Sequence, residues 1–107
     1  MKVFISQPMR DKTVEEIELE REEIMQHLRE KFGKDVEELP SYFEETGPES
    51  DRDAMKLLGK SIALMADADL VYFAHGWENS RGCSIENNCA ITYGLDVIED
   101  YRKGAQP

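Results

Sequence analysis

The sequence predicts a small α/β domain, a doubly wound parallel sheet of about four strands with flanking helices. Short apolar, β-favouring runs alternate with longer amphipathic segments in the order βαβαβαβ. The run at residues 70–74 is apolar throughout, which is typical of a central parallel strand covered on both faces. At 107 residues the chain has the size of one domain, so we expect a single domain over residues 1–107.

The first part of the chain predicts strand, helix and strand. The apolar run of residues 3–5 indicates a buried strand that ends in a loop at residues 6–11. Thr13 and Glu16 have the spacing of a capping box, and Gly33 stands where a helix would stop, so a helix is expected from about Thr13 to Phe32. Its apolar positions recur at helical spacing: Val14, Ile17, Ile24, Leu28 and Phe32.

The next segment predicts a weaker strand and a second helix. Residues 35–40 favour a strand near an edge of the sheet, because Pro40 cannot donate to a ladder. Residues 44–49 have a loop composition. Ser50 with Asp53 three positions on is an N-cap signal for a helix over about residues 51–66.

The last part predicts strand, loop, helix and strand. The strand of residues 70–74 is followed by a loop over 75–82, a helix from Cys83 to Tyr93, a stop at Gly94 and a strand over 95–98. Right-handed crossovers then place the first and third strands side by side, with the second outside the first. Residues 101–107 carry no strong pattern, and we expect them to be frayed.

Composition excludes several classes of protein. A formal net charge of −10 argues against a nucleic-acid binder, which needs clustered Lys and Arg. No apolar stretch is long enough to cross a membrane, and the N-terminus lacks the pattern of a secretory signal, so we expect a cytoplasmic location. Cys83 and Cys89 are expected on opposite faces of one helix as small buried side chains; with His75 they match no common zinc spacing, so neither metal nor cofactor is expected.

The topology places a ligand site at the carboxyl ends of the first and third strands. Ligands of open parallel sheets bind at these ends where the winding direction reverses. Loops 6–10 and 75–82 meet there, while Asp67 and Asp69 should lie at the opposite edge as turn and cap residues. His27 is expected to face solvent. The candidate ligand-binding residues are Ser6, Gln7, Pro8, Met9, Arg10, His75, Gly76, Trp77, Asn79, Ser80, Arg81 and Gly82.

Glu86 is the candidate catalytic residue. It is expected in the first turn of the helix after residue 82, where the positive end of the helix dipole favours an ionised carboxylate. A charged carboxylate can act as a nucleophile. Acidic residues are also common at helix starts for stability alone, so the position by itself does not identify a catalyst.

Three segments together resemble the nucleoside 2-deoxyribosyltransferase-like superfamily, in particular a compact branch of unknown function found in bacteria and phages. They are residues 3–9 (VFISQPM), 68–71 (ADLV) and 76–90 (GWENSRGCSIENNCA). The resemblance covers nearly the whole chain and implies a flavodoxin-like or Rossmann-like fold. It also implies that Glu86 attacks the anomeric carbon of a nucleoside or nucleotide, so that the base is exchanged or the N-glycosidic bond is hydrolysed.

The sequence departs from the transferases at three positions. Phe4 stands where the transferases carry a tyrosine that positions the nucleophile, and Ser61 where they carry an aspartate that helps protonate the base. Ser80 replaces an aspartate six positions before the nucleophile, as in the related deoxynucleoside 5'-monophosphate N-hydrolases. The usual proton donor is therefore unidentified, and the alternative is a non-catalytic nucleotide-binding or regulatory module.

Two further expectations follow from these residues. A 5'-phosphate should improve binding through Ser80 and Arg81 at the start of the helix, although Ser80 could instead only cap the helix and Arg81 pair with a surface carboxylate. A domain this small offers limited walls around a nucleoside, and the relatives complete their pockets with a neighbouring subunit. We therefore expect a homodimer or a higher homo-oligomer, with helix faces at the interface.

Overall fold

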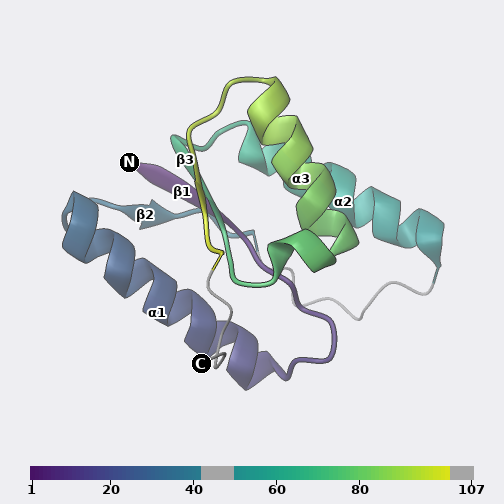
Figure 1. Cartoon of the computed structure of the whole chain (residues 1–107), viewed down its shortest axis with the longest axis horizontal. Helices are drawn as coiled ribbons and strands as arrows, with labels where there is room; N and C mark the ends of the chain where they lie inside the picture. The colour runs from purple at the N-terminus through teal and green to yellow at the C-terminus, as the bar shows by residue number, and fades with distance from the viewer. Residues whose placement is uncertain (42–49, 102–107) are drawn as a thin grey trace.

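The computed structural model, which describes residues 1–41 and 50–101, contains a four-stranded parallel sheet (Figure 1). Its strands are β1 (Lys2–Ser6), β2 (Glu37–Glu38), β3 (Leu70–Phe73) and β4 (Val97–Glu99), in the spatial order β2-β1-β3-β4. The predicted α/β class, the adjacency of the first and third strands and the outer place of the second are confirmed. The expected loop at 44–49 and all but the first residue of the expected frayed tail at 101–107 lie outside the described residues.

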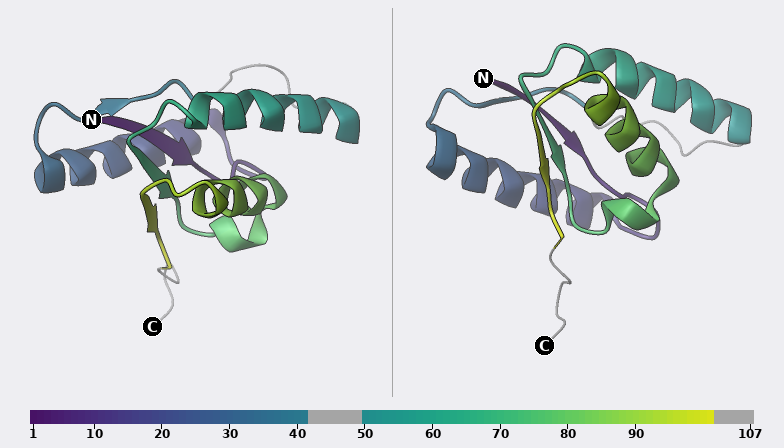
Figure 2. Two further views of the ribbon diagram at one scale, coloured as in Figure 1. Left: turned by 90° about the horizontal axis from the view of Figure 1, so that it is seen from above. Right: turned by 45° about the horizontal axis from the view of Figure 1, so that its top comes forward.

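Helices cover both faces of the sheet, as the two views of Figure 2 show. Helix α1 (Val14–Phe32) lies on one face, and α2 (Asp51–Met65) and α3 (Arg81–Thr92) lie on the other. Each face has its own apolar core, since successive strand residues point to opposite sides. The α1 side is built on Val3, Ile5, Leu28 and Tyr72, and the opposite side on Phe4, Val71, Phe73 and Trp77. Among the described residues, no helix is long and apolar enough to span a bilayer.

Helix α1 starts as its capping box predicts. The Thr13 hydroxyl accepts from the Glu16 N–H, and the Glu16 carboxylate accepts from the Thr13 N–H. The bond from the Thr13 N–H to the carboxylate is the largest cause that lowers the pKa of Glu16, and the Thr13 side chain adds to it, because both favour the charged form. The helix stops at Gly33, whose φ of 106° is a left-handed value that glycine tolerates.

Two residues expected on the buried face of α1 are exposed. Val14 and Phe32 stand at its two ends and are 49% and 43% exposed. The 19 residues of α1 extend over about 28 Å. The five residues of β1 extend over only about 17 Å, so the ends of the helix pass beyond the sheet.

The edge strands differ from the sequence prediction in length and register. Strand β2 comprises two residues instead of the predicted 35–40, because only Glu37 and Glu38 pair with β1. Strand β4 begins at Val97 instead of residue 95, because the Leu95 N–H still bonds to the Ala90 carbonyl of α3. Before β4, the hydrogen bonding of α3 thus continues into residues that were predicted to be strand.

Helix α3 begins two residues earlier than predicted. A short 3₁₀ helix, η1 (Trp77–Asn79), occupies much of the predicted loop, and Ser80 caps α3 by accepting from the Cys83 N–H at 3.4 Å. Glu86 therefore lies in the second turn of α3, not in the first. Cys83 is buried as expected, whereas Cys89 is half-buried; both thiols are free.

Candidate functional site

The two predicted loops lie side by side at the carboxyl ends of β1 and β3. Ser6 ends β1 in register with Phe73, and its carbonyl accepts from the Ala74 N–H at 2.8 Å. Beyond this bond the loops stay close, since a Cβ placed on Gly76 would lie 3.9 Å from Cγ of Pro8. Gly76 has a φ of 85°, the left-handed value that turns the chain from β3 into η1.

Glu86 lies under this edge and contacts the first loop. It is 7% exposed, and its Oε1 accepts a hydrogen bond from the Ser6 hydroxyl at 2.7 Å. The bond joins residues 80 positions apart, so only the folded sheet brings them together. Within residues 1–41 and 50–101, Glu86 forms no salt bridge.

The electrostatics of Glu86 differ from the sequence expectation. Burial raises its pKa to about 7, while the Ser6 hydrogen bond lowers it by a smaller amount. The helix dipole was expected to keep the carboxylate ionised. Loss of hydration outweighs that effect here, because the dipole acts mainly within the first turn and Glu86 lies in the second. The side chain is thus poised to gain or lose a proton near neutral pH.

Cys83 lies beside Glu86 on the same face of α3. Burial is the largest cause that raises the pKa of its thiol, and the Glu86 charge adds to it; the Ser6 and Ser80 hydroxyls oppose the rise. Reactive cysteines need a lowered pKa and access to solvent. Cys83 has neither, so of these two side chains the carboxyl of Glu86 is the candidate for a reactive group.

The second loop supplies buried groups whose hydrogen-bonding capacity is unused in the described part of the chain. Trp77 is 8% exposed and packs against Phe73 and Tyr101, with ring centroids 5.5 and 5.8 Å apart. Its Nε1 and the Nδ1 of half-buried His75 are buried and have no partner. Buried polar atoms normally have one, so these two atoms are candidates for ligand contacts.

Ser80 and Arg81 both have structural partners. The Ser80 hydroxyl caps α3, and Nη1 of Arg81 lies 3.3 Å from Oδ1 of Asp51. These are the contacts that the alternative to a phosphate site predicts. The Arg81 and Asp51 side chains are 69% and 91% exposed, so their ion pair is worth little and leaves the guanidinium accessible.

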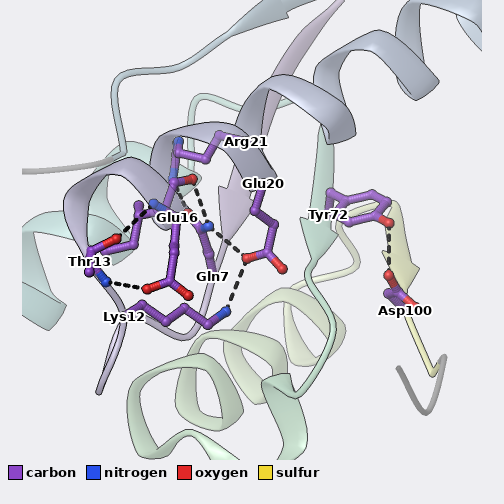
Figure 3. Close-up of polar contacts among 9 residues, drawn as sticks. Gln7, Lys12, Thr13, Glu16, Glu20, Arg21, Tyr72 and Asp100 are labelled. Atoms are coloured by element: carbon purple, nitrogen blue, oxygen red, sulfur yellow. Dashed lines mark hydrogen bonds and ion pairs between the residues drawn. The ribbon is translucent and has the colours of Figure 1, made fainter. Parts of the chain in front are cut away.

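In the first loop, Ser6 and Gln7 are buried, Pro8 and Met9 half-buried, and Arg10 exposed. The Gln7 amide is directed at α1, where it donates to the Ile17 carbonyl and to Glu20 at 3.0 and 2.7 Å. Figure 3 shows Gln7 and Lys12 converging on the Glu20 carboxylate. In this structure Gln7 therefore fastens the loop to α1.

Arg21 is not among the predicted site residues, yet it is only 5% exposed, on the buried face of α1. Its guanidinium donates to Glu38 at 2.8 Å, to Gln7 at 3.2 Å and to Ser41 at 2.6 Å. The sequence does indicate that Arg21 is buried. It follows Ile17 by four positions and precedes Met25 by four, which places it on the buried stripe of the helix.

A cavity of about 330 Å³ lies on the α1 side, away from Glu86. It is lined by Glu18, Arg21, Glu22, Met25, Arg29, Glu38 and Pro40. The structure thus brings together Ser6, Glu86 and the two loops, whereas a nucleoside-sized pocket around them stays a prediction.

In the described ranges, no three His, Cys, Asp or Glu side chains are grouped to hold a metal ion. Asp69 accepts from the Lys2 N–H at 2.7 Å, at the opposite edge of the sheet, and His27 is exposed.

Comparison with known proteins gives one match. The model of a family described as a domain of unknown function, DUF4406, matches residues 1–99. No curated protein and no solved structure matches the chain.

Proposed function

The chain belongs to the DUF4406 family, and we propose that it binds a nucleoside or nucleotide and cleaves or exchanges its N-glycosidic bond through Glu86. The observation that carries the proposal is the buried carboxyl of Glu86 at the carboxyl edge of the sheet, which among the described residues is held by one hydroxyl and no cation. Perturbed carboxyls of this kind concentrate at functional sites. The resemblance of residues 76–90 to the nucleoside 2-deoxyribosyltransferase-like superfamily supports the choice of substrate.

The proposed chemistry is a double displacement. Ionised Glu86 attacks the anomeric carbon, the bond from that carbon to the base nitrogen breaks, and its electron pair leaves with the base. Water or a second base then displaces Glu86 and restores the carboxylate. The departing base needs a proton, and half-buried His75, in the loop after β3, is a titratable side chain that could supply it.

The direct test is base release from a panel of nucleosides and 5'-monophosphates, measured by chromatography. Glu86→Gln should lose roughly 100-fold or more of the activity, because the amide is not a nucleophile. Glu23→Gln is a matched control, since Glu23 is exposed on α1, and it should keep wild-type turnover. Near-normal turnover of Glu86→Gln would exclude Glu86 as the nucleophile.

The pH profile distinguishes two roles of Glu86. With its pKa raised to about 7, a nucleophile gives a kcat/KM that increases between about pH 5 and 8 as the carboxyl ionises. A general acid gives the opposite slope. The sign of the slope therefore tests the assignment independently of substrate identity.

A non-catalytic nucleotide-binding module is the second candidate. It is favoured by Phe4 and Ser61, which supply no phenol and no carboxylate for the transferase roles, and by the structural contacts of Ser80 and Arg81. Calorimetric binding of a nucleotide without base release over long incubation would support this module. Base release that depends on Glu86 would refute it.

The proposal includes self-association and a cytoplasmic location. Of the described residues of α2 only Met65 is buried, although Leu57, Leu58 and Ile62 are apolar, and Met55 is 66% exposed. A second copy packed on this helix would cover these side chains. Light scattering should then find a dimer or larger species, and Met55→Glu should weaken it; a monomer at high micromolar concentration would contradict the proposal. Cell fractionation would test the location.

A further inference from the structure

The contact between Ser6 and Glu86 assigns a role to Ser6 that differs from ligand binding. We propose that Ser6 is the positioning residue of Glu86: its hydroxyl holds Oε1, so that Oε2 is the oxygen left to react. The inference rests on the proposed function of Glu86 and specifies which of its two oxygens carries it out.

The position of Ser6 is fixed by the centre of the sheet. It is the last residue of β1, it is 2% exposed, and its carbonyl bonds to the first residue after β3. Its pairing with Phe73 of β3 holds its backbone, so the hydroxyl has little freedom to move away from α3. A donor on such a rigid element can orient a longer, more flexible side chain.

The geometry at the carboxylate is asymmetric. The 2.7 Å distance between Oγ and Oε1 is typical of a hydroxyl that donates to a charged acceptor. Glu86 has no other hydrogen-bond partner in the described portions of the chain. One oxygen is therefore anchored and the other is available, which restricts a glutamate to one reactive orientation.

The neighbouring groups direct the Ser6 hydrogen toward Glu86. The Cys83 thiol also interacts with the Ser6 hydroxyl, and its raised pKa keeps it protonated at neutral pH. A neutral S–H can donate to Oγ, which leaves the hydroxyl hydrogen for the carboxylate. Of the other charged or titratable groups, Lys12 favours the Cys83 thiolate, and the two loops of this edge also carry Arg10, Asp11, His75, Glu78 and Arg81.

The first experiment needs no substrate. The Glu86 carboxyl is titrated by NMR in protein labelled with carboxyl-carbon glutamate, and the missing signal in Glu86→Gln gives its assignment. Ser6→Ala should raise the titration midpoint by roughly one pH unit, because the lost bond favours the ionised form. Ser6→Thr keeps the hydroxyl and should restore most of the wild-type value. Glu86 titrating at the wild-type midpoint in Ser6→Ala would overturn the inference.

The second experiment separates positioning from substrate contact. Ser6→Ala should lower kcat by roughly 10-fold with KM nearly unchanged, and should move the midpoint of the kcat profile to higher pH. A raised KM with an unmoved midpoint would overturn the inference. If Ser6→Ala does not fold, Ser6→Cys has a similar shape and a weaker donor, and should shift both midpoints in the same direction. Absence of base release by the wild-type protein would refute the proposed function, while the titration still decides the bond between Ser6 and Glu86.

Discussion

Two buried charged side chains, one on each face of the sheet, have opposite surroundings. Arg21, on the buried face of α1, is 5% exposed and donates to a carboxylate, an amide and a hydroxyl. Glu86 beneath the carboxyl edge is 7% exposed and accepts from one hydroxyl. The two side chains are almost equally buried, but among the described residues Arg21 has three side-chain hydrogen-bond partners and Glu86 has one.

The difference separates a structural charge, that of Arg21, from the one proposed to be functional, that of Glu86. A charge removed from water costs several kcal/mol unless partners replace its hydration. The partners of Arg21 replace it, and they connect α1, β2 and the first loop. Glu86 meets the cost instead by holding a proton up to a pKa of about 7. A bound ligand could supply the partner that the ionised Glu86 carboxylate lacks in the described part of the protein.

The largest expected effect tests the structural charge. Arg21→Met should lower the free energy of unfolding by about 3–5 kcal/mol, because Gln7, Glu38 and Ser41 lose their shared donor. Arg29→Met removes an exposed guanidinium of the same helix and should change stability by less than about 0.5 kcal/mol. Denaturant unfolding measures both. Equal effects would remove the distinction between the two arginines.

For Glu86 we predict the opposite effect on stability: removing its charge should stabilise the protein at high pH. The pKa of Glu86 is raised in the folded state, so the folded protein binds a proton more tightly than the unfolded chain between about pH 4.5 and 7. Stability should therefore fall by about 3 kcal/mol as pH rises through that window, and stay lower above it. Glu86→Gln should abolish this fall and be the more stable protein at pH 8. Thermal unfolding against pH measures it, with Glu23→Gln as control; parallel curves would contradict the raised pKa.

The smallest effect concerns an anion beside Glu86. Because the ion pair of Arg81 with Asp51 is exposed, a bound phosphate could recruit the guanidinium at little cost. A deoxynucleoside 5'-monophosphate should bind roughly 10-fold more tightly than its nucleoside, and Ser80→Ala with Arg81→Ala should erase the difference. Arg29→Ala is the control. Calorimetry that finds equal affinities in the wild-type protein would leave Ser80 and Arg81 with structural roles alone.

Local signals in the sequence were sufficient for most of the fold. The caps at Thr13 and Ser50 and the apolar run of β3 act over a few residues, and each produced the expected element. The same reasoning placed the two loops at one edge. It also selected Glu86 as a candidate, and the structure brings it to Ser6.

The remaining features depend on contacts between distant segments. The raised pKa of Glu86 follows from burial against a segment 80 residues away, which helix position alone does not indicate. Gln7 was expected in the site, whereas its amide bonds to Ile17 and Glu20 of α1. The early start of α3 depends on η1, whose turn from Gly76 resembles an ordinary loop in composition.

The two-residue strand β2 limits how the molecule can aggregate. A free sheet edge is a template on which a strand from another molecule can add, and long apolar edges promote such growth. Strand β2 offers only Glu37 and Glu38, and Pro40 shortly after it has no N–H to donate. The carboxylate of exposed Glu37, in a chain of net charge −10, repels a second copy approaching there, whereas that of Glu38 is paired with Arg21 at 2.8 Å. Growth of amyloid-like ladders from this side of the sheet is therefore disfavoured.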